Sequence, residues 1–462
     1  MMVRPLLTTL IVAFGLLQAS TFTQSKFSFR VVSSGLGAPW EVVYGPDNQL
    51  WVTERTARRV IRVNPTTGAV TPLLQIDESY DPGDSWHEGV LGLALHPDLL
   101  KKTGRDYVYV AYTYDSDPGD GLSRKLKVRR YTYDAGKSTL GDPVDLITNL
   151  PAHNDHGGGR VTFGPDQKLY VSRGDNGGNW LANYCTPMRS QDLPTALQIG
   201  SSDWSTYVGK ILRMNLDGTI PPDNPTLNGV RSHIHSYGHR NPQGLSFGPT
   251  GLLYSSEHGP GTDDEVNLIL AGRNYGWPHV AGYRDDRGYV YANWSQSKGV
   301  PCSSLTFDEF TAPPSVPQQK ETEWKGEFEP PLRTFFTVPA DYKPKPDVGA
   351  TIAAGGIEIY SARTNGIPGW ANSILLPGMT MGRVYRLKLS EDGRSVVGEN
   401  EELFQTANRY RDIAIGGDQQ TFYLVTDNNG LGRSTDPSGA SIRTFANPGS
   451  ILEFKYTGPA AR

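Results

Sequence analysis

Short alternating runs of apolar and polar residues dominate the chain, and helical periodicity is almost absent. One phrase recurs: an aromatic or apolar residue, a turn of the Gly-Pro-Asp type, and then an aromatic strand. Its copies begin at residues 44, 163 and 247, with a looser copy at residue 415. Because Gly, Pro and Asp favour the backbone angles of tight turns, each copy predicts a β-hairpin between two buried strands.

A second phrase is an alternating strand that ends in a glycine turn. Its six copies, unevenly spaced, are Val60–Gly68, Val128–Gly136, Ile211–Gly218, Val266–Gly272, Val384–Gly393 and Ile451–Gly458. Six copies of one strand type favour radial repetition of four-stranded sheets. We therefore predict an all-β fold, a six-bladed β-propeller, with long insertions near residues 180–205 and 285–345. A large β-sandwich is the alternative, and the internal repeats argue against it.

The N-terminal segment has the layout of a secretory signal peptide. Arg4 is its one charge, an apolar run extends from Leu6 to Leu17, and small residues follow. This run is too short to span a bilayer comfortably, although a membrane anchor is the alternative. We predict a signal peptide over residues 1–20, a single propeller domain over 21–462, no membrane span in the mature chain, and a secreted or periplasmic location. Cys185 and Cys302 can pair there, but the sequence does not show that they do.

Composition narrows the function classes. The 462 residues include 44 Lys and Arg against 48 Asp and Glu, a formal charge of −4, which argues against binding nucleic acid. Two cysteines exclude a disulfide scaffold and a four-cysteine metal site. With 52 Gly, 34 Pro and 23 Tyr, the chain is typical of an ordered, turn-rich β protein.

One loop presents a histidine beside a carboxylate. His156 follows Asp155 and precedes three glycines, just before a strand of the repeat. An imidazole in such a place can accept a proton near neutral pH. Asp175 follows the next predicted strand and can orient His156. A histidine in an ordinary surface turn is the alternative.

Two further loops carry donors and hard oxygen ligands. Arg240 and Asn241 supply several donors that suit an oxyanion or a carboxylate, unless the arginine only braces neighbouring blades. The turn at Gly259 and Pro260 exposes backbone carbonyls and precedes three acids, a combination that suits Ca²⁺. A solvated acidic turn is the alternative for the second loop.

An arginine pair forms the fourth piece. On a strand, Arg409 and Arg411 point to one face. Two neighbouring guanidinium groups repel unless an anion lies between them, so the pair predicts an acidic ligand with more than one carboxylate. The alternative is pairing with Asp or Glu of the chain itself.

Over roughly residues 30–458, these four pieces in this order resemble the soluble glucose and aldose sugar dehydrogenases that depend on pyrroloquinoline quinone (PQQ). The resemblance also runs through Pro39–Glu41, Gly92–Asp98, Gly209–Arg213 and Asn274–Pro278. It implies a propeller with PQQ and Ca²⁺ over its channel. It also implies oxidation of a glucose-like aldose at C1 to the lactone, an external electron acceptor (a quinone or a small redox protein), and a homodimer.

The same resemblance assigns residues. His156 matches the general base, with Asp175 or Asp155 setting its tautomer, and Arg240 matches a residue that stabilises charge on the quinone oxygen. The positions that match cofactor contacts are Asn241, Thr351, Arg409, Arg411, His87 and Thr380, of which the last two replace a glutamine and a lysine of the family. Gly259 and Pro260 match ligands of the cofactor calcium. A second calcium site that supports the dimer matches Glu265, Tyr275, Ala281, Tyr283, Asp285 and Glu321.

Two other function classes stay open at this point. A calcium-dependent propeller lactonase needs a calcium deep in the channel, held by side-chain carboxylates, and has no use for the arginine pair. A non-enzymatic secreted binding propeller needs the repeats but neither His156 nor Arg240.

Overall fold

The computed structural model describes residues 26–83, 87–119, 121–308, 311–339, 341–342, 350–433 and 440–461. The signal peptide predicted at residues 1–20 lies outside this part of the chain. Among the described helices, none has the length and apolarity that crossing a membrane requires.

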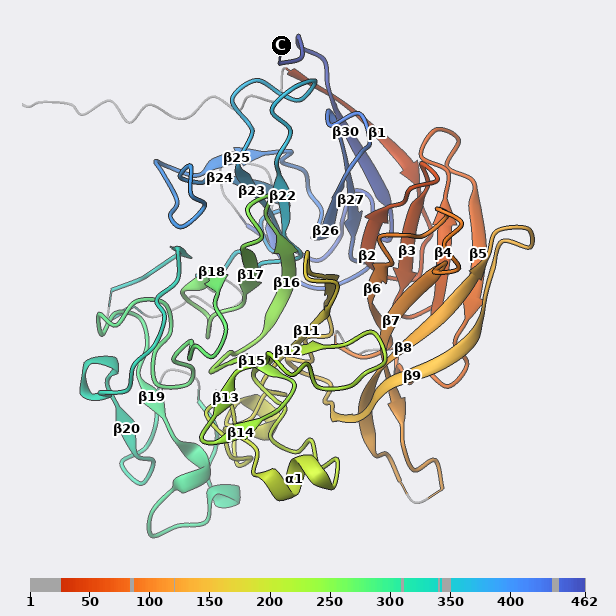
Figure 1. Cartoon of the computed structure of the whole chain (residues 1–462). Coiled ribbons are helices and arrows are strands. Elements are labelled where there is room, and N and C mark those ends of the chain that lie inside the picture. The colour runs from red at the N-terminus through yellow and green to blue at the C-terminus, as the bar shows by residue number, and fades with distance from the viewer. Residues whose placement is uncertain are drawn as a thin grey trace, which may run out of the picture.

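Within the described residues, six four-stranded antiparallel sheets form the blades of a propeller (Figure 1). Blade 1 consists of β2 (Pro39–Tyr44), β3 (Leu50–Glu54), β4 (Arg59–Val63) and β5 (Val70–Gln75), and blade 2 of β6 (Val90–Leu95), β7 (Tyr107–Asp115), β8 (Arg124–Asp134) and β9 (Thr139–Pro151). Blade 3 consists of β10 (Val161–Phe163), β11 (Leu169–Arg173), β12 (Lys210–Met214) and β15 (Ile234–Tyr237), and blade 4 of β16 (Pro242–Phe247), β17 (Leu253–Glu257), β18 (Asp264–Ile269) and β21 (Arg333–Phe335). Blade 5 consists of β22 (Glu358–Tyr360), β23 (Ser373–Gly378), β24 (Arg383–Lys388) and β25 (Glu401–Leu403), and blade 6 of β26 (Tyr410–Ile415), β27 (Thr421–Thr426), β30 (Ile451–Tyr456) and β1 (Phe27–Ser33).

The repeats in the sequence correspond to fixed places in the blades. Each of the six sequence segments that end in a glycine turn overlaps one strand at the same position of each sheet. These strands are β4, β8, β12, β18, β24 and β30. The Gly-Pro-Asp phrases are the turns of the hairpins β2–β3, β10–β11, β16–β17 and β26–β27. The predicted six-bladed propeller is therefore confirmed.

The ring closes through its two chain ends. The inner strands contact one another in the cyclic order β2, β6, β10, β16, β22, β26 and back to β2. In blade 6 the N-terminal strand β1 pairs with the C-terminal strand β30, with Phe27 opposite Tyr456 (Figure 1). This closure occupies a sheet edge that would otherwise be exposed.

Between blades, apolar side chains of neighbouring sheets pack face to face. One cluster joins Leu91 and Leu126 of blade 2 to Leu169 and Leu212 of blade 3, and all four side chains are buried. Such packing holds the blades as rigid supports, so the loops at their ends are set by the sheets.

A buried ionic cluster lies at the axis. Residues from all six inner strands line a cavity of about 340 Å³. Arg160 is the residue before β10. Its Nη1 atom lies 2.7 Å from Glu41 Oε1 on β2 and 3.0 Å from Asp412 Oδ2 on β26, so this one side chain connects three blades. Ser246 Oγ donates to Glu358 Oε2 at 3.4 Å. Burial and nearby Asp412 raise the pKa of Glu358, Ser246 and Arg160 oppose the shift, and the net pKa is about 8.

This carboxyl group gives a pH-dependent prediction. Its pKa rises from 4.5 to about 8 on folding, so the native state binds the extra proton between those pH values and stability falls as pH rises through them. Glu358→Gln removes the contribution of this group, while Glu41, whose pKa is also raised to about 8, keeps its own. We expect the wild type to lose up to ~1.4 kcal/mol more per pH unit than the variant over that window.

Unfolding both proteins with guanidinium chloride at pH 5, 6.5 and 8 gives the free energy of unfolding at each pH, and thus the difference in slope. Glu399→Gln, on an exposed side chain, is the matched control and should follow the wild type. Equal pH slopes in the wild type and Glu358→Gln would contradict the assignment.

Two insertions leave the blades, near the positions predicted. The first separates β11 from β12 and carries η2 (Leu181–Asn183) and α1 (Ala196–Gly200). The second separates β18 from β21 and carries β19 (Tyr291–Ala292), β20 (Gln318–Gln319), η3 (Trp294–Gln296), η4 (Cys302–Ser304) and η5 (Glu321–Glu323). Smaller hairpins are β13 (Thr226–Leu227) with β14 (Val230–Arg231), and β28 (Gly432–Arg433) with β29 (Ser441–Ile442).

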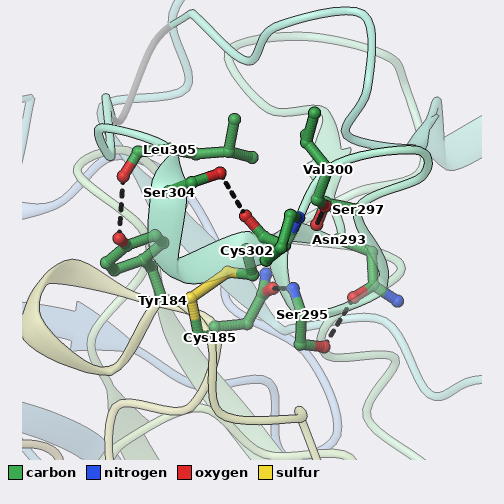
Figure 2. The surroundings of a disulfide bond; sticks show 11 residues. Tyr184, Cys185, Asn293, Ser295, Ser297, Val300, Cys302, Ser304 and Leu305 are labelled. Atoms are coloured by element: carbon green, nitrogen blue, oxygen red, sulfur yellow. Dashed lines mark hydrogen bonds between the residues drawn. A yellow bond between two sulfur atoms is a disulfide. The ribbon is translucent and has the colours of Figure 1, made fainter.

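A disulfide joins the two long insertions (Figure 2). Cys185 and Cys302, 117 residues apart, are bonded with an S–S distance of 2.07 Å. Beside the disulfide, the Tyr184 hydroxyl donates to the Leu305 carbonyl at 2.8 Å. The pairing that the sequence left open is therefore present, and it fixes one insertion against the other.

Candidate active site

The predicted loops meet at one end of the axial channel. His156 precedes β10, Arg240 and Asn241 precede β16, and Arg411 lies at the start of β26. The Asp175 amide donates to the Arg240 carbonyl at 2.8 Å, and the His258 amide donates to the Asn241 carbonyl at 3.3 Å. Backbone hydrogen bonds thus hold the connection between blades 3 and 4 against a loop of each blade.

A carboxylate holds the imidazole of His156. Asp175 Oδ1 lies 2.7 Å from His156 Nδ1 and accepts from the Gly177 amide at 2.8 Å. Its other oxygen accepts from Trp277 Nε1 at 2.8 Å. Because an ionised carboxylate only accepts hydrogen bonds, Nδ1 carries the proton, and Nε2 keeps a lone pair that can take one.

Arg173 and Gly174, at the end of β11, hold the loop that carries His156 in place. The buried guanidinium of Arg173 donates to the carbonyls of Gly157 and Pro151, at the two ends of the loop. A Cβ atom on Gly174 would lie 1.9 Å from the His156 carbonyl oxygen, so only glycine allows this approach. The imidazole is therefore positioned by rigid backbone.

Asp155 and His87 lie on the other side of the ring. Asp155 Oδ1 is 3.5 Å from His156 Nε2 and 3.6 Å from His87 Nε2. Burial raises the pKa of Asp155, but His156, His87 and Arg240 outweigh burial and bring it down to about 2. Burial lowers the pKa of His87 to about 3, so this imidazole is neutral. Of the two carboxylates that the sequence left open, Asp175 is the one at Nδ1.

Arg240 and Asn241 present donors without partners. The Arg240 guanidinium carbon lies 5.2 Å from the Trp180 ring centre and 5.3 Å from that of Trp277. Gln243 Nε2 donates to Asn241 Oδ1 at 2.8 Å, which fixes the orientation of the amide. Among the described residues, Arg240 Nε and Asn241 Nδ2 are buried with no hydrogen-bond partner. Buried orphan donors are costly, so this pair fits oxygen atoms of a bound group.

The arginine pair has an internal counter-ion. Asp427 Oδ2 lies 2.9 Å from Arg411 Nη2 and 3.3 Å from Arg409 Nε. Burial raises the pKa of Asp427, but Arg411 and Arg409 outweigh burial, and the net pKa is lowered. The alternative of pairing within the chain is thus part of the structure, and the repulsion argument alone does not require an anionic ligand.

Thr351 and Thr380 lie together beside the loop of Gly259 and Pro260, which is predicted to bind calcium. Asp264 accepts from the Gly259 amide at 3.0 Å and from Thr351 Oγ1 at 2.6 Å. Thr380 Oγ1 donates to the Thr351 carbonyl at 2.8 Å. Both hydroxyl groups thus donate inside the protein, and their assignment as cofactor contacts stays a prediction.

The residues of the second predicted calcium site gather around the loop at residues 281–286. Glu321 accepts from the amides of Ala281 at 2.9 Å and Asp285 at 3.2 Å, while Glu265 accepts from the Gly282 amide at 2.7 Å. The other members, Tyr275 and Tyr283, are buried and exposed respectively.

At this predicted calcium site, the chemistry of the carboxyl groups fits a cation, but the arrangement of the described side chains does not yet form a metal site. Burial raises the pKa of Glu265 to about 8 and of Glu321 to about 7, as expected for carboxyl groups without a nearby cation. Within the described residues, no group of three or more imidazole, thiol or carboxyl side chains is arranged to hold a metal ion. The chemistry of these acids fits a cation, but the site stays a prediction.

Several members of the site carried no signal in the sequence. Trp277 lies inside a motif of the family resemblance, but nothing there linked it to Asp175. Gln243 and Asp427 are single polar residues. Gln243 Oε1 also accepts from Arg411, 168 residues away, whereas Asp427 follows the next strand of the blade that carries the arginine pair. Only the spatial arrangement of the inner strands shows that they act on Asn241 and the arginine pair.

Fold and site together define the class of protein: a six-bladed propeller in which a carboxylate-held histidine and several guanidinium groups share one channel mouth. Comparison with known proteins gives the family. The chain matches the glucose/sorbosone dehydrogenase family over residues 36–329 and 338–433, and it belongs to that family.

Two relatives support this placement. Quinoprotein glucose dehydrogenase B of Acinetobacter calcoaceticus is 40% identical over 454 residues, covering 95% of this chain and 94% of the relative. The PQQ-bound structure of an aldose sugar dehydrogenase from Streptomyces coelicolor aligns with a TM-score of 0.63 and 28% identity, covering 93% of this chain and 98% of that one.

Proposed function

We propose that this protein is a PQQ- and Ca²⁺-dependent aldose sugar dehydrogenase that oxidises a glucose-like sugar at C1 to the lactone. The observation that carries the proposal is the pairing of His156 with Asp175 beside the orphaned donors of Arg240 and Asn241. Family membership and the names of the two relatives support the same reaction.

PQQ fits the residues present. Its quinone oxygens suit Arg240 Nε and Asn241 Nδ2, which have no hydrogen-bond partner among the described residues. Its carboxylates suit the guanidinium groups of Arg409 and Arg411. The carbonyls of Gly259 and Pro260 would hold Ca²⁺. When bound, PQQ supplies the two-electron oxidation of the sugar carbon.

The chain's own residues handle the proton and the charge. His156 Nε2 takes the proton of the C1 hydroxyl, and Asp175 stabilises the imidazolium that forms. The fixed donors of Arg240 and Asn241 stabilise negative charge that develops on a neighbouring oxygen, without reorganisation. An external quinone or small redox protein then removes the electrons. The secreted or periplasmic location, the signal peptide and the homodimer belong to the same proposal.

The lactonase alternative finds no support in the channel. Of the three acids in the channel cavity, Glu41 and Asp412 are paired with Arg160, and Glu358 accepts from Ser246. The charge of Arg160 opposes a cation there.

Reconstitution tests the proposal. Purified protein is loaded with PQQ and CaCl₂ and assayed with a panel of aldoses and a reducible dye. We expect dye reduction that requires PQQ, falls on chelation of calcium, and yields lactone. Lactone hydrolysis without PQQ, together with no dye reduction by any aldose, would favour the hydrolase instead.

A further inference from the structure

A pocket opens between blades 2 and 3, at the end of these blades that is remote from His156. It has a volume of about 440 Å³. Lys168 lines this pocket and precedes β11, whereas Asp175, which holds His156, follows β11, so the length of that strand separates the two sites. We call it the donor pocket and define it by the side chains that determine its chemistry: His96, Arg105, Tyr109, Arg130, Lys168 and Asp217.

His96, which follows β6, contributes an N–H group without a partner. The Asp98 amide donates to His96 Nδ1 at 2.9 Å, so the ring is neutral and its proton lies on Nε2. Burial lowers the pKa of His96, and Arg105 adds to this shift although Asp98 opposes it. The residue is 2% exposed, and its Nε2 has no hydrogen-bond partner among the described residues. The imidazole is therefore a buried donor that nothing in the described chain satisfies.

Two further donors come from the neighbouring strands. Tyr109 on β7 is fully buried, and burial raises the pKa of its phenol, so the hydroxyl keeps its proton. Arg130 lies opposite Tyr109 on β8, and its guanidinium carbon lies 4.3 Å from the ring centre of Tyr107. In the described part of the chain, the Tyr109 hydroxyl and Arg130 Nε are both buried with no hydrogen-bond partner. Because orphaned donors are costly to bury, this cluster fits a bound group that only accepts hydrogen bonds.

The charge around the donor pocket favours an anion. Within the described residues, the side chains of Arg130 and Lys168 form no ion pair. Arg105 Nη1 lies 3.5 Å from Asp98 Oδ2 and is thus partly neutralised. Asp217 is the one acid among the described residues that line the pocket. A cation would meet like charges and few acceptors here, whereas an anion would meet donors and uncompensated positive charge.

The donor set also selects the kind of anion. The three donors belong to three consecutive segments of blade 2, so they approach from different directions. A phosphate group offers several strong acceptor oxygens and up to two negative charges, whereas a carboxylate offers two oxygens in one plane and a single charge. A tetrahedral oxyanion therefore matches these donors and cations better than a carboxylate does.

We propose that the donor pocket binds a tetrahedral oxyanion of the phosphate class, free or as part of a larger molecule, whose oxygens accept from His96, Tyr109 and Arg130. This site lies apart from the proposed active site and does not depend on the proposed function.

Binding of inorganic phosphate to the full-length protein tests the proposal. Calorimetric titration at neutral pH and constant ionic strength, in a chloride buffer, should show one saturable site. The melting temperature should rise with phosphate concentration, because the anion binds the native state. Acetate should bind about tenfold more weakly or not at all, since it has fewer acceptor oxygens and less charge.

Two variants remove donors from the pocket. Tyr109→Phe deletes only a hydroxyl group, so it should weaken phosphate binding about three- to tenfold without lowering the melting temperature in chloride. Arg130→Gln should weaken binding about tenfold or more, because it removes a charge-assisted hydrogen bond. The matched control is Lys137→Gln, which removes an exposed cation paired with Asp134 in the turn after β8 and should bind phosphate as the wild type does.

The source of the phosphate group is resolved by comparing ligands. Equal affinity for inorganic phosphate and glycerol phosphate supports the free anion, and tighter binding of glycerol phosphate supports a larger phosphorylated ligand. Absence of saturable binding of phosphate, sulfate and glycerol phosphate at millimolar concentrations would overturn the proposal. So would wild-type phosphate affinity in folded Tyr109→Phe and Arg130→Gln, or acetate binding as tight as that of phosphate.

Discussion

Replacing His156 with alanine is expected to lower kcat for aldose oxidation by about 10²- to 10⁴-fold, the contribution typical of a positioned general base. The side chain is 7% exposed, and its ring is fixed by Asp175, so the substitution removes the proton acceptor while the backbone of the loop stays in place. Binding of PQQ, followed by its absorbance, should change little, because its predicted contacts come from other loops.

His153 provides the matched control for this prediction. It lies in the same loop, but its ring lies 3.0 Å from Asn183 rather than beside Asp175. His153→Ala should therefore keep most of the rate. Added imidazole should restore part of the rate in His156→Ala, since the missing group is a base. Normal turnover by a folded, PQQ-loaded His156→Ala would contradict the role of His156.

Replacing Asp175 with asparagine is expected to have an effect of similar size, about 10²- to 10⁴-fold in kcat, since it disturbs the same base. The carboxylate accepts from His156, Gly177 and Trp277 with both oxygens. An amide can offer only one acceptor oxygen. If its NH₂ group faces His156, Nδ1 must become the acceptor, and Nε2 then carries the proton and cannot act as base.

The tautomer makes this prediction specific. Nitrogen-15 NMR of labelled histidine should show the His156 proton on Nδ1 in the wild type and on Nε2 in a variant with the amide turned this way. Asp192→Asn, at an exposed ion pair with Arg189, is the control. A rate within threefold of the wild type, with the melting temperature unchanged, would show that Asp175 does not set the base.

The blades were predictable because their signals are local. Turn residues and alternation are set within about ten residues, and each repeat copy fell on the same strand of a blade. The closure of the ring was not predictable in this way, because Phe27 and Tyr456 pair across almost the whole chain. The Cys185–Cys302 bond is of the same kind, since composition shows that two cysteines exist but not that the two insertions meet.

In the candidate site, too, local sequence signals were predictable and contacts between distant segments were not. His156 and Arg240 lie in glycine- and proline-rich loops that mark exposed functional turns, so sequence reasoning found them. The contacts that support them join distant segments, since Trp277 is 102 residues from Asp175 and Gln243 is 168 residues from Arg411. The arginine pair shows the same limit: the sequence left open whether it pairs with an acid of the chain, and the structure identifies that acid as Asp427, 16 residues from Arg411.

The central claim is that one channel mouth joins a base to a redox cofactor, and a single anaerobic turnover tests it most directly. Protein loaded with PQQ and Ca²⁺ is mixed with glucose without any acceptor, while the cofactor spectrum and the lactone are both measured. The account predicts complete reduction of the bound cofactor with about one lactone formed per cofactor. An oxidised spectrum that persists with glucose and with every other aldose tried would contradict it.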